Sequence, residues 1–201
     1  MQCNTDADCT TGPCNVCPPT GQLCLAPLAP VASLATGACK SVLAACDTTT
    51  AATCGPLGSH AVGARPLAIA FDGANMWVTS QTGNTVTELS PTGATLGTFA
   101  VGSAPYGIAF DGTNMWIANT GSNTVSKLSP TGATLGTFAM GAPERIAFDG
   151  TNMWITTGSN TVTKLSPTGA TLGTFAGSES WEIAFDGLHM WVANGSNVTE
   201  L

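Results

Sequence analysis

The stretch "YGIAFDGTNMWIANTGSNTVSKLSPTGATLGTFAM", Tyr106–Met140, is the sequence unit from which the fold of this chain can be predicted. Turn-forming residues divide it into four short segments. The apolar "YGIAF" runs into Asp111-Gly112, a strong hairpin signal, and "NMWIAN" follows. "TVSKL" comes next, and the turn "SPTG" then leads into "ATLGTFAM", with Pro fixing φ and Gly supplying a positive φ. The stretch therefore predicts four β-strands joined by tight turns.

The same unit recurs along the chain, and such internal repeats determine the architecture. "AFDGANMWVTS", "AFDGTNMWIAN", "AFDGTNMWITT" and "AFDGLHMWVAN" begin at Ala70, Ala109, Ala147 and Ala184, which are 39, 38 and 37 residues apart. Four strands in roughly 40 residues, repeated, is typical of a β-propeller blade. We therefore expect an all-β propeller with four blades, over about 66–101, 105–140, 143–176 and 181–201.

The aromatic residues of each unit fit this interpretation. Inner strands of a propeller are covered on both faces and need apolar side chains on both. Each complete unit has a Phe at the end of its first strand, a Trp in its second and a Phe in its fourth. The residues are Phe71, Phe110, Phe148 and Phe185, then Trp77, Trp116, Trp154 and Trp191, and finally Phe99, Phe138 and Phe175.

The segment before the first blade, residues 57–62, has the pattern of a fourth strand without its first three. The last unit stops at Leu201, after its third strand. In one arrangement the segment closes the ring within the chain. In another it completes the last blade of a neighbouring molecule by strand addition, which generates a ring or a fibre. A third arrangement, in which the units are a piece of a larger propeller, also stays open.

The N-terminal segment, residues 1–54, contains every cysteine of the chain. They are Cys3, Cys9, Cys14, Cys17, Cys24, Cys39, Cys46 and Cys54. An even number in a short segment is typical of a disulfide framework in a secreted protein, although it does not fix the pairing. Cys14 and Cys17 have the spacing of redox and zinc sites, but no second pair or neighbouring His accompanies them. We expect an irregular, disulfide-stapled segment of an extracellular or cell-surface protein, with no signal peptide in this sequence.

Composition excludes several classes of partner. Charged residues make up 8% of the chain, the formal net charge is −7 and the pI is about 4.4. Nucleic acids and anionic membranes attract clustered Lys and Arg, which are missing here. No apolar run approaches the ~20 residues that a membrane-spanning helix needs. We expect neither nucleic-acid binding nor membrane insertion.

Four aspartates, one in each "FDG", are the most regular polar feature. They are Asp72, Asp111, Asp149 and Asp186. Arranged radially, four carboxylates could hold a hard cation such as Ca²⁺. The adjacent Gly and the nearby Asn or His favour the other interpretation, in which each Asp caps its own turn.

No catalytic constellation can be assembled from the residues of the chain. It lacks a Ser-His-Asp, Cys-His or HExxH arrangement, so we expect no catalytic, metal-binding or cofactor-binding residue. Asn194 and Asn197 lie in glycosylation-type sequons. Tyr106 and Trp181 break the repeat pattern at the start of their blades and are candidate ligand-contacting aromatics.

The unit "PYGIAFDGTNMWIANTGSNTVSKLSPTGATLGTFAMG" resembles blades of the bacterial propeller superfamily that includes virginiamycin B lyase-like and NHL-type proteins. The resemblance covers Pro56–Leu201 and implies the propeller fold. Its lyases use histidine and acidic side chains around a divalent metal at the propeller mouth. His60 and His189 match no such motif, so the resemblance does not carry the activity over. "CNTDADCTTGPCNVC" resembles short Cys-rich modules of secreted bacterial proteins.

These observations favour a non-catalytic extracellular structural or adhesive module. Its near-uniform repeats and low charge suit self-assembly into a surface filament or ring, as a homo-oligomer or polymer joined by residues 55–62 and the open edge of the last blade. The alternatives are a metal-dependent lyase or hydrolase of the virginiamycin B lyase-like type and a glycan- or peptide-binding propeller.

Overall fold

A computed structural model describes residues 58–177 and 182–201 of this chain. The chain divides into two units, Met1–Ser59 and His60–Leu201. The cysteine-rich segment with its eight cysteines and Trp181 lie outside the described residues, and their predicted roles stay predictions. The described residues form fifteen strands, and none of them belongs to a helix long and apolar enough to cross a membrane.

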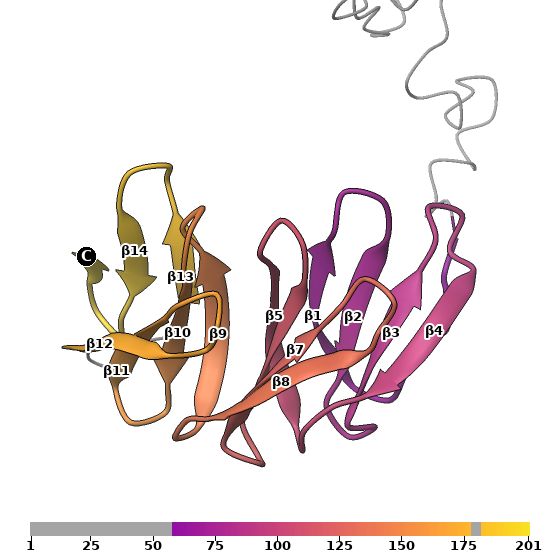
Figure 1. The fold of residues 1–201 in the computed structure, drawn as a ribbon, viewed down its shortest axis with the longest axis horizontal. Coiled ribbons are helices and arrows are strands. Elements are labelled where there is room, and N and C mark those ends of the chain that lie inside the picture. The colour runs from indigo at the N-terminus through magenta and orange to yellow at the C-terminus, as the bar shows by residue number, and fades with distance from the viewer. Residues whose placement is uncertain (1–57, 178–181) are drawn as a thin grey trace, which may run out of the picture. The chain divides into compact units, whose positions relative to one another are not determined.

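The second unit consists of antiparallel sheets that follow one another along the chain (Figure 1). The first contains β1 (Pro66–Phe71), β2 (Met76–Ser80), β3 (Thr85–Leu89) and β4 (Thr95–Ala100) in that order. The second contains β5 (Pro105–Phe110), β6 (Met115–Asn119), β7 (Thr124–Leu128) and β8 (Thr134–Ala139). The third contains β9 (Pro143–Phe148), β10 (Met153–Thr157), β11 (Thr161–Leu165) and β12 (Thr171–Ala176). The fourth contains β13 (Glu182–Phe185), β14 (Met190–Ala193) and β15 (Val198–Glu200). The predicted four-stranded blade is confirmed.

The turn between the third and fourth strands forms as its sequence requires. In the second blade the backbone N–H of Gly132 donates to the carbonyl of Ser129 at 2.9 Å. Gly132 has a φ of 77°, which glycine adopts at no steric cost. The turns at Gly93 and Gly169 repeat this geometry. Each SPTG motif is therefore a rigid corner that returns the chain as the outer strand.

The hydrophobic core lies between the blades. Each blade has a front face, formed by the Trp of its second strand and the Val of its third. Its back face is formed by the Ile of its first strand, the Met of its second and the Leu of its third. In the core between the first two blades, Trp77 and Val86 pack with Ile108, Met115 and Leu128. The same arrangement recurs at the next two boundaries, around Trp116 and around Trp154.

The two ends of the blade array correct one prediction. Residues 58–62 form no strand, and the last sheet has three strands with β15 at its edge. Ring closure within the chain is therefore not present among the described residues. The physical reason is that a fourth strand depends on its third-strand neighbour, as Phe99 depends on Val86 in the first blade. In the part of the chain that the structure describes, no third strand lies beside residues 58–62.

Packing between blades predicts how the fold responds to truncation of a side chain. Ile117 is completely buried between the first and second blades, whereas Leu135 in the outer strand β8 is 56% exposed. We expect Ile117→Ala to lower the free energy of unfolding by about 2–5 kcal/mol and Leu135→Ala by less than about 1 kcal/mol. Denaturant unfolding followed by tryptophan fluorescence measures both. Equal losses would contradict a core located between the blades.

Candidate functional site

The FDG aspartates accept hydrogen bonds from their own turns and from the Trp of the same blade. In the third blade, Oδ1 of Asp149 accepts the backbone N–H groups of Thr151 and Asn152 at 2.8 and 2.6 Å. Oδ2 accepts the indole N–H of Trp154 at 2.6 Å. The other three turns have the same pattern of two backbone bonds and one indole bond. The turn-capping interpretation is confirmed, and each carboxylate fixes the Trp of its blade.

These bonds stabilise the ionised aspartates. Burial acts to raise the pKa of Asp149, but hydrogen bonds from Trp154 and the turn backbone, together with Lys164, lower that pKa from 3.8 to about 2. In the last blade, the backbone N–H of His189, the Trp191 indole and the backbone N–H of Leu188 lower the pKa of Asp186 to about 2. The carboxylates therefore remain charged in their turns down to strongly acidic pH.

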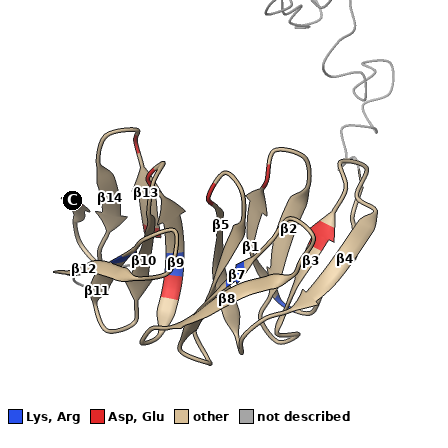
Figure 2. Cartoon of the chain, in the orientation of Figure 1, with Lys and Arg blue, Asp and Glu red and all other residues tan. Residues whose placement is uncertain are grey.

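A charged residue of the third strand covers the outer side of each Asp–Trp pair. Lys164 Nζ lies 4.5 Å from the ring centroid of Trp154 and 3.3 Å from Asp149 Oδ2. Lys127 repeats this arrangement in the second blade. The first and last blades have Glu88 and Glu200 at this position, where Asn75 and His189 contact them. The aspartates lie at the turns between first and second strands (Figure 2).

The first strands of all four blades surround a hollow of about 280 Å³, here called the axial hollow. Its lining residues are Leu67, Ala68, Ile69, Gly107, Ile108, Arg145, Ile146 and Glu182. The guanidinium of Arg145 lies 4.1 Å from the ring centroid of Tyr106. Its Nε lies 3.2 Å from Glu182 Oε2. A stack and an ion pair therefore hold one cation at the meeting point of three blades.

The axial hollow is where the otherwise uniform units differ. The two residues before the first-strand Ile are Leu67-Ala68, Tyr106-Gly107 and Glu144-Arg145 in the first three blades. Glycine at 107 is required by close approach, because a β-carbon there would collide with the carbonyl of Glu144. The sequence signalled Tyr106 as a departure from the repeat. It gave no sign of the Arg145–Glu182 pair, since the two lie 37 positions apart.

The other candidate residues are not gathered into one site. His60 lies against Gly93 of the first blade, whereas Nδ1 of His189 lies 3.3 Å from Glu200 Oε1 in the last. Within residues 58–177 and 182–201 no group of three or more His, Cys, Asp or Glu could hold a metal ion. Asn194 is buried and its side-chain amide donates to Asn197 and Thr199, and glycosylation at this residue stays a prediction. Asn197 is exposed.

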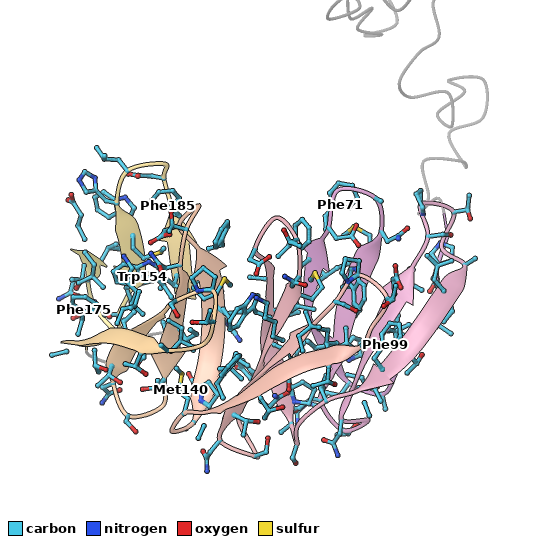
Figure 3. The ribbon with its side chains drawn as sticks, viewed as in Figure 1. Phe71, Phe99, Met140, Trp154, Phe175 and Phe185 are labelled. Atoms are coloured by element: carbon cyan, nitrogen blue, oxygen red, sulfur yellow. The ribbon has the colours of Figure 1, made fainter. Side chains whose placement is uncertain are left out.

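The terminal blades expose residues that are core elsewhere. On the back face of the first blade Ile69 is 60% exposed, whereas its equivalents Ile108, Ile146 and Ile183 are 5–8% exposed. Phe71, labelled in Figure 3, is 56% exposed on the same blade. On the front face of the last blade Trp191 is 37% and Val198 60% exposed. The equivalents of Trp191 are Trp77, Trp116 and Trp154, and the equivalents of Val198 are Val86, Val125 and Val162. All six are at most 7% exposed.

Comparison with known proteins identifies the fold as a β-propeller. Virginiamycin B lyase from Staphylococcus aureus superposes with a TM-score of 0.60 at 20% identity, over 66% of this chain and 50% of that one. A streptogramin B lyase gives 0.56 at 18% identity, over 67% of this chain and 53% of that one. The computationally designed Ika4 protein gives 0.62 at 15% identity, over 72% of this chain and 94% of that one.

These neighbours match the propeller superfamily that the sequence resembles. This chain spans about half the length of the two lyases. No family model and no curated protein matches the sequence. At these sequence identities the structural similarity establishes the fold alone, so a function has to be inferred from the residues of this chain.

The lowered pKa of Asp149 predicts an acid-dependent loss of stability. A carboxylate whose pKa is 3.8 unfolded and about 2 folded contributes stability above pH 4 that disappears between about pH 4 and pH 2. We expect the melting temperature of the wild type to fall over this range, and more steeply than that of Asp149→Asn. Thermal melts monitored by circular dichroism measure this. Glu144→Gln, outside the FDG turns, is the matched control, and equal slopes for all three proteins would contradict the role of Asp149.

Proposed function

We propose that this chain is a non-catalytic structural module whose function is assembly through the faces of its terminal blades. The observation that carries the proposal is the exposure of Ile69 and Phe71 at one end and of Trp191 and Val198 at the other. Monomeric proteins rarely leave contiguous apolar patches uncovered, and such patches mark interaction surfaces. Here the exposed residues are of the kinds that form the three internal boundaries.

The two exposed faces are complementary. The first blade exposes its back face, which in the other blades is covered by the front face of the preceding blade. The last blade exposes its front face, which in the other blades is covered by the back face of the following blade. Phe71 is 56% and Trp191 37% exposed, so burying the exposed part of either side chain is worth about 1–4 kcal/mol at ~25 cal/mol/Å². Association of the two faces therefore has a hydrophobic driving force and a geometry that the chain already uses internally.

An extracellular structural or adhesive role is the setting we propose for this assembly. The eight cysteines of residues 1–54 support it, because disulfide frameworks persist in oxidising compartments. Large Thr-, Ser- and Asn-rich surfaces of low charge also suit packing among copies. A lyase activity of the kind that two neighbours' names describe is a weaker candidate, because His60 lies against the first blade whereas His189 belongs to the last.

Assembly through the blade faces is tested by charge insertion. We expect the wild type to have a molar mass above the 20.2 kDa of one chain, and Ile69→Asp or Val198→Asp to return it to that value, because a buried unpaired carboxylate opposes association. Multi-angle light scattering after size exclusion measures the mass. Leu135→Asp, at a 56% exposed outer-strand position, is the matched control and leaves association unchanged. A wild type of 20.2 kDa at every concentration would contradict the proposal.

Ligand binding in the axial hollow is the second candidate function. The observation that favours it is the fixed guanidinium of Arg145 beside the apolar residues Ile69, Ile108 and Ile146. An arginine held in one orientation pairs bidentately with carboxylates. The arrangement suits a small acid with an apolar body.

Hexanoate is a suitable probe of the axial hollow. We expect its titration to shift the amide NMR signals of Gly107 and Ile108, and Arg145→Gln to weaken binding by about tenfold. Lys164→Gln, which removes a cation of β11 away from the axial hollow, is the control and keeps the wild-type affinity. Unchanged signals at these amides up to saturating hexanoate would rule out this candidate.

A further inference from the structure

We infer that two copies of this 201-residue chain close into one eight-bladed ring, in which residues 58–62 of each copy form the fourth strand of the other copy's last blade. The inference rests on the proposed assembly through the terminal faces. It identifies the partner as a second copy of the chain and the number of copies as two. The contact between residues 58–62 of one copy and β15 of the other is here called the joint. Three features of the structure support it, namely the position of His60, the open edge of β15 and the match of the two end faces.

His60 already occupies the position of a fourth-strand aromatic. The ring of Phe99 lies directly on Gly132 of the next blade, and the ring of Phe138 lies on Gly169 in the same way. The imidazole of His60 lies on Gly93, the equivalent glycine of the first blade. His60 therefore lies on the first blade as the fourth-strand aromatic of a preceding blade would.

The chain that follows His60 confirms this equivalence. Gly63 packs against Ser80 as Gly102 packs against Asn119, the residue at the same place in the second blade. Arg65 and Ala104, which precede the first strands of their blades, have φ values of 56° and 50°. The path from residue 60 to β1 is thus the path from β4 to β5.

The last blade offers the missing three strands and an open edge. Leu201 and Met190 exchange both backbone hydrogen bonds, at 2.9 and 3.1 Å. Because bonding alternates along an antiparallel pair, the N–H groups of Val198 and Glu200 point away from β14. In the complete blades these bonds go to the fourth strand, where Val86 pairs with Phe99. The equivalent pair across the two copies is Val198 with His60.

The faces around this joint also match. Each complete blade stacks its Trp on its fourth-strand Phe, with ring centroids 5.2–5.4 Å apart. In the ring, His60 of one copy would stack on Trp191 of the other, and Ile69 would be covered by Trp191 and Val198. Glu200 is compatible with this boundary, because Glu88 holds the same position at the boundary between the first and second blades.

The number of copies depends on how the blades of one chain turn. Head-to-tail contacts between different faces give a ring if the rotation closes and a fibre if it does not. The superposed part of this chain covers 50% and 53% of the two lyases, which favours two copies in a closed ring.

Cysteine cross-linking in trans tests the joint. In the complete blades Thr85 pairs with Ala100 and Thr124 with Ala139, and the equivalent pair across copies is Asn197 with Ala61. Facing Cα atoms of such pairs are ~4.5–5.5 Å apart, within disulfide range. Ala61→Cys chains mixed with Asn197→Cys chains can join only between copies. Each full-length chain is oxidised at equal concentration, and peptide mapping separates the new linkage from the native cysteines.

We expect a 61–197 disulfide in most of the mixed sample and a mass of about 40 kDa, twice the 20.2 kDa of one chain. Ala100→Cys mixed with Asn197→Cys is the matched control and does not link, because Ala100 is already paired within its own blade. Absence of the 61–197 linkage overturns the joint. A linkage found only within single Ala61→Cys/Asn197→Cys chains also overturns it, because the ring would then close in one copy.

The molar mass separates this inference from the assembly on which it rests. A mass that rises with concentration beyond two copies, and falls with Ile69→Asp, supports assembly through the end faces but overturns the two-copy ring. A mass of one chain at every concentration overturns both. Replacing His60 provides a second readout, because His60→Phe restores the Trp–Phe stack and should tighten the dimer about two- to tenfold.

Discussion

The contacts of the Trp indole in the second strand hold each blade together and join it to the next blade. Its N–H is bonded to the FDG aspartate, and in the complete blades one ring face is stacked on the fourth-strand Phe. The same ring packs against the back face of the next blade, as Trp116 packs against Ile146. One side chain thus ties a turn, a sheet and the neighbouring blade together. This shared role explains why the Asp, Trp and Phe recur at fixed places in the sequence.

In an array of blades that pack face to face, the first and last blades each have one uncovered face. Because the blades share one sequence pattern, these uncovered faces carry the residue types that form the core elsewhere. The exposure of Ile69 and Trp191 follows from this constraint and needs no special surface design. The axial hollow follows a different rule. Tyr106, Arg145 and Glu182 belong to none of the three boundary cores, so these positions can differ between units without disturbing the boundaries. Ile69 lines the axial hollow and also lies on the exposed back face of the first blade.

The sequence predicted the parts of the fold that local pattern controls. The strands, the SPTG corners and the aspartate caps depend on residues within about five positions of one another, and all three were predictable. The Arg145–Glu182 pair was not, because it depends on how far neighbouring blades rotate. The strand predicted at residues 57–62 was wrong for the single chain, since a strand's own residues do not supply its partner. The imidazole of His60 nevertheless lies on Gly93 as the ring of Phe99 lies on Gly132.

Amide hydrogen exchange at β15 tests whether the blade boundary inside the chain is repeated between chains. In a single chain the N–H groups of Val198 and Glu200 face solvent at the sheet edge. We expect both amides to exchange slowly at high protein concentration, and Ile69→Asp, on the other terminal blade, to restore fast exchange. Exchange at these two amides as fast as at the exposed Gly195 and Ser196, at every concentration, would contradict it.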